Sequence, residues 1–400
     1  MKKKINPILF ISILLFVVSA LSYFVFNIYE LHVKKAPSKS AEILFPEELK
    51  EPEIVKQICE RQDLIDYFYY QEVPEEKKSN NKFGIYIYAE VSEFFRLAER
   101  LVNSSGGEWG YVLIPYNIRD RDKSKWNEVF SQLNRRKLIP VVQLYDVNPN
   151  NYEEDTKEAA EFLDQFLWPI KQRYISVYNE PNDSRFWKGI LDPKNYAEVL
   201  NFTIDTFKLQ NDNFFMLNGA FNVSASNVGT TMDSFQFILA MNDHIPGIFS
   251  KLDGWASHPY PQPNFSGSPY ASGRNSIRAY EDELAFLESL GVSKKLPVFI
   301  TETGWAHAEG EVYNPSFLPA SEVAQNFKIA YEEFWLADDR VVAIMPFTIW
   351  YGAPFDHFAW VNSSRIPYEQ FDVVKSIEKV KGNPDKLVKA GISIGCEVNE

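Results

Sequence analysis

Residues 174–182 read Tyr-Ile-Ser-Val-Tyr-Asn-Glu-Pro-Asn, a short run of β-branched and aromatic residues that ends in an amide, a carboxylate and a proline. Such a run suits a buried strand, and the proline suits the turn that ends it. A second run of this kind, residues 296–302, reads Leu-Pro-Val-Phe-Ile-Thr-Glu. Each run therefore carries one glutamate, Glu180 or Glu302, at the expected end of a strand.

The rest of the chain repeats a strand-and-helix rhythm around these two runs. The strand-like runs are residues 83–88, 110–116, 139–145, 174–178, 214–221, 252–258, 296–301 and 341–350. Stretches with apolar residues at helical spacing are 91–102, 126–133, 159–170, 196–209, 232–241, 277–290, 323–336 and 368–380. Eight tandem units predict an α/β fold, the (β/α)8 TIM barrel. No glycine-rich turn follows the first run, which disfavours an open doubly wound sheet.

The carboxyl ends of the strands are where a barrel places its chemistry. Glu180 and Glu302 end the fourth and seventh predicted strands, so both side chains are expected over the barrel mouth. Two carboxylates across a small cleft suit the cleavage of a glycosidic bond, in which one carboxyl group protonates the leaving oxygen and the other attacks or stabilises the sugar carbon. Each carboxylate also raises the pKa of the other.

Around these glutamates the chain resembles a known group of enzymes. Residues 178–181 (Tyr-Asn-Glu-Pro) and 300–305 (Ile-Thr-Glu-Thr-Gly-Trp) are similar to the acid/base and nucleophile segments of the clan A, or 4/7 superfamily, retaining glycoside hydrolases. That clan includes cellulases, β-mannanases, β-xylosidases and β-glucosidases. The resemblance covers roughly residues 82–380 through the strand order. It implies that Glu180 is the acid/base and Glu302 the nucleophile, and that no cofactor is needed.

Further candidates for sugar binding follow from the resemblance or from position at a strand end. The resemblance implies roles for Asn179, His258, Tyr260, Trp305 and Trp350, whereas Asn117, Asn222 and either Tyr86 or Tyr88 are located by strand ends alone. Trp187, on the loop after the fourth strand, suits either a sugar platform or loop packing. One departure stands out: many clan members carry an arginine on the second strand, where this chain has Leu113, and Arg119 is the nearest possible substitute.

Composition excludes several classes of function. The net charge of −13 offers no basic surface for nucleic acid. The five histidines show no HExxH motif and no metal-ligand spacing, so no metal site is predicted. We expect a carbohydrate as the substrate and a monomer as the working state. The sugar configuration and linkage, and exo or endo action, stay open.

The N-terminus predicts export. Three lysines at residues 2–4 precede an apolar stretch at residues 8–28, long enough to span a bilayer. We expect a retained membrane anchor with the barrel outside the cytoplasm; the alternative is secretion after cleavage near Ala20. The predicted organisation is an anchor (1–35), a stalk and lead-in (36–80), the barrel (81–385) and a C-terminal tail (386–400). Cys59 and Cys396 lie near the two ends of the folded part and either pair or remain separate thiols.

Two other functions remain open at this point. The first is a membrane-anchored barrel that binds carbohydrate without turnover. The presence of both acids, Glu180 and Glu302, argues against it. The second is an unrelated barrel enzyme such as an aldolase, which would need a Schiff-base lysine or a phosphate-binding glycine-rich loop; neither is evident.

Overall fold

The computed structural model describes residues 65–392 of the 400-residue chain. Ten strands lie in this part: β1 (Ile65–Gln71), β2 (Gly84–Tyr86), β3 (Gly110–Asn117), β4 (Leu138–Tyr145), β5 (Arg173–Val177), β6 (Phe214–Asn218), β7 (Trp255–Ser257), β8 (Val298–Ile300), β9 (Val341–Ile344) and β10 (Lys386–Ile392). The main helices are α3 (Ser92–Val102), α4 (Lys123–Arg136), α5 (Glu153–Asp164), α6 (Pro193–Gln210), α7 (Ser234–His244), α8 (Ala279–Ser289), α9 (Ala320–Ile329) and α10 (Glu369–Ser376). Short helical turns are η1 (Glu75–Lys77), η2 (Ile248–Lys251), the π-helical η3 (Ala330–Trp335) and η4 (Asp356–Phe358).

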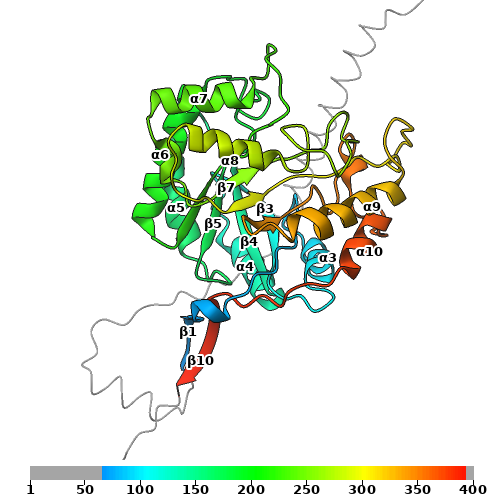
Figure 1. The fold of residues 1–400 in the computed structure, drawn as a ribbon. Coiled ribbons are helices and arrows are strands. Elements are labelled where there is room, and N and C mark those ends of the chain that lie inside the picture. The colour runs from blue at the N-terminus through cyan, green and yellow to red at the C-terminus, as the bar shows by residue number, and fades with distance from the viewer. Residues whose placement is uncertain (1–64, 393–400) are drawn as a thin grey trace, which may run out of the picture. The chain divides into compact units, whose positions relative to one another are not determined.

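The strands β2 to β9 form a closed parallel barrel. Five of them pair in the order β2-β3-β4-β5-β6 and three in the order β7-β8-β9. Parallel bridges between Leu217 and Gly254 and between Phe83 and Ile344 join the two sheets at both seams. At the first seam the buried Asn218 amide accepts from the Ala256 N–H and donates to the Ala256 carbonyl, which replaces the missing ladder bonds. The predicted order of eight strand–helix units is confirmed (Figure 1).

Side chains inside the barrel form a core of their own. Every barrel strand contributes to this cluster, whose members are Tyr86, Tyr111, Leu113, Ile139, Val141, Tyr174, Leu217, Ala256, Phe299 and Ala343 with their neighbours. The rings of Tyr174 and Phe299 lie 5.0 Å apart between their centroids and fill the interior. The barrel is therefore a packed core, and its free space lies at the ends of the strands.

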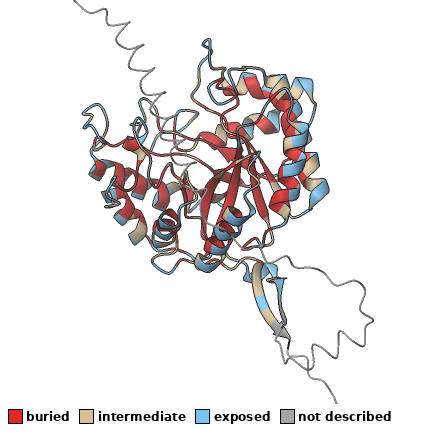
Figure 2. Cartoon of the chain, turned by 180° about the vertical axis from the view of Figure 1, so that it is seen from behind, coloured by how far each residue is buried: buried red, intermediate tan, exposed pale blue. Residues whose placement is uncertain are grey.

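The helices cover the outside of the barrel with their apolar faces turned inward, as the red inner and blue outer sides in Figure 2 show. Aspartates begin several of them: the Asp122, Asp192 and Asp233 side chains accept backbone N–H groups in the first turns of α4, α6 and α7. Pro193 follows at the first position of α6, where its missing N–H costs nothing.

Among the predicted segments, two differ most from the structure. The helix expected at residues 159–170 is α5, which begins at Glu153, because three acidic residues in its first turn interact favourably with the positive end of the helix dipole. It ends before Trp168, whose indole N–H donates to the Leu163 carbonyl. The strand expected at residues 341–350 ends at Ile344. Pro346 has no N–H to donate to β2, although its carbonyl still accepts the Tyr86 N–H at 3.0 Å.

Strands β1 and β10 form a separate two-stranded sheet that the sequence did not predict. The Val73 N–H donates to Asp385 at 2.7 Å, so β1 ends where β10 begins. The Lys171 N–H donates to the Asp385 carbonyl and the Leu387 N–H to that of Pro169, which attaches this sheet to the segment before β5. Figure 1 shows the two strands side by side.

The predicted anchor, the possible cleavage site at Ala20 and both cysteines lie outside the described residues. Within residues 65–392, no helix is long and apolar enough to cross a membrane.

Candidate active site

Glu180 leaves β5 through a strained turn. Tyr178 and Glu180 have φ angles of 73° and 36°, a region that residues other than glycine rarely adopt. The Glu180 N–H donates to the Ala220 carbonyl at 3.0 Å. The Tyr178 ring packs on Trp187 with centroids 5.4 Å apart. Surrounding packing therefore holds a conformation that the turn alone would not keep, and strain of this kind is common where a side chain must be aimed.

Glu302 follows β8 and is fixed by the residues after it. The Thr303 hydroxyl donates to the Pro259 carbonyl at 2.7 Å, which ties this turn to the segment that follows β7. Gly304 has a φ of 138°, and a Cβ there would lie 3.1 Å from the Phe327 ring. Position 304, two residues after Glu302, therefore requires a glycine.

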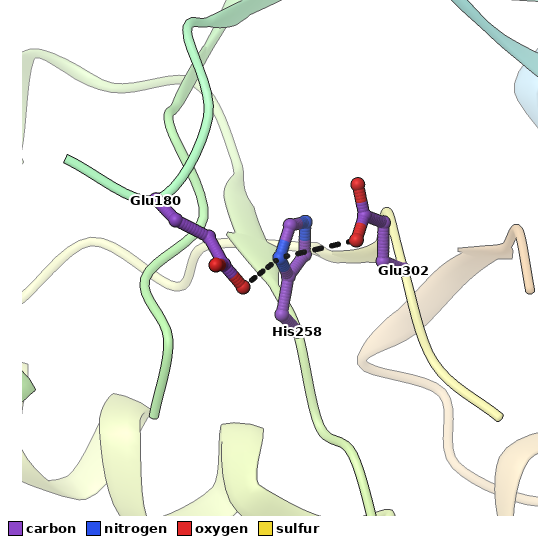
Figure 3. A group of neighbouring side chains, drawn as sticks. All are labelled: Glu180, His258 and Glu302. Carbon is purple, nitrogen blue, oxygen red and sulfur yellow. Dashed lines mark hydrogen bonds and ion pairs between the residues drawn. The ribbon is translucent and has the colours of Figure 1, made fainter. Parts of the chain in front are cut away.

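His258, at the end of β7, stands between the two carboxylates (Figure 3). Its Nδ1 lies 3.0 Å from Glu180 Oε1 and 3.8 Å from Glu302 Oε2. The ring is fully buried. One oxygen of each glutamate and one His258 nitrogen all lie within 4.8 Å of one another. The fourth, sixth and seventh barrel strands thus bring three titratable groups together at the barrel mouth.

The protonation of this cluster is coupled. Burial raises the pKa of Glu302, His258 opposes this shift, and the Glu180 carboxylate adds to it. Burial lowers the pKa of His258, but the charges of Glu302 and Glu180 outweigh burial and leave it raised. Because Glu302 and His258 each change the charge that the other feels, protonation of one affects protonation of the other.

An aromatic wall stands beside Glu302. The Tyr260 hydroxyl donates to Glu302 Oε2 at 3.0 Å, which favours the ionised carboxylate. The Tyr260 ring packs against Phe265 and Phe358. Tyr86 is buried nearby, and burial together with the charge of Glu302 raises its pKa. Of the two tyrosines considered on the first barrel strand, Tyr86 is therefore the one beside the nucleophile candidate.

A buried carboxyl group supports this cluster from behind. Glu283 lies on α8 with no exposed surface, and Ser257, next to His258, donates to it at 2.5 Å. Burial raises the pKa of Glu283 to about 7. Glu283 was not predicted from the sequence, although its position carries a signal. It shares one helical face with Tyr280 and Leu287, and a charged residue on a buried apolar face is rare unless it has a partner.

Three of the predicted sugar-binding tryptophans lie in packed positions. Trp305 is buried and its indole donates to the Gly267 carbonyl at 2.7 Å. Trp187 is also buried and donates to Asn195, so loop packing, not a platform, accounts for it. Trp350 packs on Tyr88 and carries the Arg365 guanidinium over its ring at 4.3 Å. For Trp187 this agrees with the loop-packing alternative, whereas the sugar-binding roles of Trp305 and Trp350 stay predictions, because sequence position fixes the strand end but not which way a ring turns.

The side chains of the remaining candidates have contacts outside the three-residue cluster. Tyr88 packs with Phe94, Trp350 and Tyr351. Asn117 donates to Asp146 at 3.1 Å, and the Asn179 amide oxygen accepts from Gln143 at 3.2 Å. Asn222 forms a parallel bridge with His258, which fixes its backbone next to the site.

No arginine is among the charged groups that shift the pKa of Glu302. Leu113 is buried in the barrel interior. Arg119 forms ion pairs with Asp146 and Asp155. Within the described residues, the charged neighbours that shift the pKa of Glu302 are His258 and Glu180. His258 is thus placed to supply the positive charge that an arginine supplies elsewhere.

Comparison with solved structures shows which fold this is. A monomeric β-xylosidase from Caulobacter crescentus is 14% identical, with a TM-score of 0.51 over 79% of this chain and 72% of that one. An endo-β-1,3-glucanase of group GH128 (subgroup II) from Sorangium cellulosum is 13% identical, with a TM-score of 0.51 over 74% of this chain and 98% of that one. This chain has the (β/α)8 barrel fold of these two glycoside hydrolases. No family model and no curated protein matches the chain.

The cluster at the mouth of this barrel also has the donor types of a metal site. Glu180, His258 and Glu302 each offer one ligand atom, and a histidine with two carboxylates is a set that binds divalent cations. No metal site was predicted from the sequence, because local histidine spacing cannot join residues this far apart. Glu180 and His258 are 78 positions apart (258 − 180), and His258 and Glu302 are 44 positions apart (302 − 258). An experiment must therefore distinguish glycoside cleavage from metal binding at these three residues.

Proposed function

We propose that the chain is a retaining glycoside hydrolase that cleaves, or transfers, a β-linked sugar of an oligo- or polysaccharide. One observation carries the proposal: the two strand-end carboxylates approach to within 4.8 Å. Retaining enzymes hold their two carboxyl groups about 5–5.5 Å apart, whereas inverting enzymes need roughly 6.5–9.5 Å to admit a water between them. The separation here favours direct attack by a carboxylate.

The proposed mechanism is a double displacement. Glu302 attacks the anomeric carbon while the glycosidic C–O bond breaks and Glu180 gives its proton to the leaving oxygen. Glu180 then takes a proton from water, whose oxygen attacks the same carbon and releases Glu302. The Tyr260 hydroxyl bond to Glu302 supports its role as the ionised partner. The alternative, a membrane-anchored barrel that binds carbohydrate without turnover, predicts binding with no covalent intermediate.

Trapping of the intermediate tests this proposal. A panel of 2-deoxy-2-fluoro β-glycosides with good leaving groups, in gluco, galacto, manno and xylo configurations, should label the protein with one sugar. Peptide mapping should place that sugar on Glu302, and Glu302→Gln should remain unlabelled. Label on another residue, or a first product of inverted configuration by NMR, would overturn the retaining mechanism. Sugar binding without turnover or label would favour the binding alternative.

Chelation separates glycosidase chemistry from metal chemistry at the same residues. Under the proposal, dialysis against EDTA leaves turnover unchanged, because proton transfer and carboxylate attack need no metal. Loss of activity that returns on addition of a divalent cation would instead assign Glu180, His258 and Glu302 as metal ligands.

We propose further that residues 8–28 anchor the protein in a membrane with the barrel outside the cytoplasm. The support is the apolar run after three lysines. A chain that begins at residue 36 should fractionate with soluble protein and keep the melting temperature of the full-length protein, whereas the full chain should require detergent. Export of the full-length protein into the medium, with a new N-terminus near residue 20, would favour signal cleavage.

A further inference from the structure

A hollow of about 230 Å³ is lined by Tyr178 and Asn179, the two residues that directly precede Glu180. Its walls come from the end of β4 and from the loop after β5, and they include Tyr145, Asp146, Asn179, Arg185, Phe186 and Lys188. Ligand pockets for drug-sized molecules usually measure roughly 300–1,000 Å³, so this space suits a single sugar ring.

Two aromatic rings in this hollow are open to solvent. Tyr145 is 44% exposed and Phe186 is 47% exposed. Their neighbours Tyr178 and Trp187 are almost completely buried, so the loop after β5 already has aromatic side chains that serve packing. An exposed ring in a concave surface offers the flat apolar face on which the C–H face of a pyranose stacks.

The charged side chains around the hollow form ion pairs with side chains of opposite charge. Asp146 forms ion pairs with Arg119 and Lys188, and Arg185 pairs with Asp183. Since each cation already has a carboxylate partner, the site has little unpaired charge to attract an anionic sugar. Hydroxyl groups both donate and accept, so a neutral sugar can bond to both members of such a pair without breaking it.

The position of the hollow assigns it to one side of the scissile bond. Asn179 lines it and directly precedes Glu180. The charge of Glu180, after the larger effect of Asp183, contributes to the raised pKa of Arg185, so the guanidinium lies within electrostatic range of that carboxylate. An acid/base must contact the leaving oxygen, which places the leaving group next to Glu180.

We infer that this hollow binds the neutral sugar unit on the leaving-group side of the cleaved bond, with Tyr145 and Phe186 as stacking surfaces. The same space then receives the acceptor when the sugar is transferred to a carbohydrate instead of to water. This inference rests on the proposed glycosidase function and names the residues that favour an oligosaccharide over a simple glycoside.

The test compares two substrates that differ only in what fills the hollow. A β-glycosyl fluoride has a leaving group too small to reach it, whereas an oligosaccharide places a sugar there. Tyr145→Ala and Phe186→Ala should each lower kcat/KM for the oligosaccharide about tenfold and leave that for the fluoride unchanged within about twofold. Tyr145→Phe, which keeps the ring, should retain most of the activity. Tyr67→Ala on β1, where the ring is 43% exposed, should behave as wild type.

The transfer reaction gives a second readout. With added oligosaccharide as acceptor, Tyr145→Ala and Phe186→Ala should form less transfer product per fluoride consumed than the wild type. Equal losses on both substrates, or no loss on the oligosaccharide, would overturn the inference while the glycosidase function stands. A wild-type protein that turns over neither substrate in any of the four configurations would instead overturn the proposed function itself.

Discussion

Each of the two glutamates at the barrel mouth is positioned by different neighbours. Glu180 depends on a strained turn and on a bond to Ala220, whereas Glu302 contacts the Tyr260 hydroxyl. The bond from a neutral phenol stabilises the ionised carboxylate. His258 contacts Glu180 more closely than Glu302, at 3.0 Å against 3.8 Å. These asymmetries support different roles for two chemically identical side chains.

Loss of the acid/base should be separable from loss of the nucleophile. Glu180→Ala should lower kcat/KM for an oligosaccharide by about 10²–10⁴-fold, because the leaving oxygen then departs without a proton. An aryl glycoside with a good leaving group should lose far less in its first step. Added azide should restore turnover and give a β-glycosyl azide, seen by NMR, since a small anion needs no base. Glu302→Gln should show no azide rescue with a retained product; such a rescue would contradict the assignment.

Glu283 should make the stability of the protein depend on pH. Its pKa is raised from 4.5 to about 7 in the folded chain, so the folded state holds the proton more tightly than the unfolded state between these values. The free energy of unfolding therefore falls as the pH rises through this window. Urea titrations should show that wild type loses about 3 kcal/mol relative to Glu283→Gln between about pH 4.5 and pH 7.

A control for this effect lies on the same helix. Glu288 is exposed, and Glu288→Gln should follow the wild-type pH dependence. A constant difference between wild type and Glu283→Gln at every pH would mean that burial of Glu283 has no consequence for its ionisation in the folded protein.

At the residue scale, the sequence predicted which residues stand at the strand ends better than it predicted which contacts their side chains form. Glu180, Glu302, His258 and Tyr260 follow strands of a parallel barrel, and strand ends must meet at one face. Trp305 follows a strand as well, yet its indole turns to Gly267 and the core. Whether a loop side chain faces the mouth or the core depends on packing between distant segments, which local pattern does not encode.

At the scale of elements, the contact between β5, β6 and α6 positions Glu180. The Tyr196 hydroxyl, on α6, donates to the Val177 carbonyl at 3.0 Å and accepts the Gly219 N–H at 2.7 Å. A Cβ on Gly219 would lie 2.6 Å from the Val177 carbonyl oxygen. The ends of the two strands are thus joined by one buried hydroxyl group in a space without room for a further side-chain atom.

Tyr196→Phe should destabilise the protein by about 1–3 kcal/mol, because it leaves a buried N–H and a buried carbonyl without this partner. Tyr331→Phe provides a matched control. Its ring is equally buried, and its hydroxyl group has no hydrogen-bond partner among the described residues, so its removal should leave the melting temperature unchanged or slightly raised. Equal losses in both variants would show that ring packing, not the hydroxyl bridge, holds these strand ends.

The elements themselves were predictable where apolar period and turn residues agree. All eight strand–helix units come in the expected order, since β-branched runs and helical spacing differ in period. The start of α5 was missed because its first turn is acidic and holds no apolar repeat. The pairing of β1 with β10 was missed because these two strands lie over 300 residues apart in the sequence, beyond the reach of any local pattern.

At the scale of the whole molecule, β1 and β10 bring the two ends of the described chain together. Val73 bonds to Asp385, so β1 runs toward the barrel beside the start of β10, which runs away from it. Residues 65 and 392 therefore lie at the same end of this small sheet. Cys59 stands six positions before the first (65 − 59) and Cys396 four positions after the second (396 − 392). One cysteine thus lies just beyond each of these two ends in the sequence, which motivates a test of whether they pair.

Under the proposed export, we expect Cys59 and Cys396 to form a disulfide. They are the two cysteines of the chain, and an oxidising compartment permits the bond. Both thiols should resist alkylation in the native protein until a reductant is added, as mass spectrometry of iodoacetamide-treated samples would show. Because the bond would close a very long loop, Cys59→Ser should lower the free energy of unfolding by roughly 6 kcal/mol in the chain-entropy view. Its Cys396 should then react freely, whereas complete alkylation of both thiols without reductant in the exported wild type would exclude the bond.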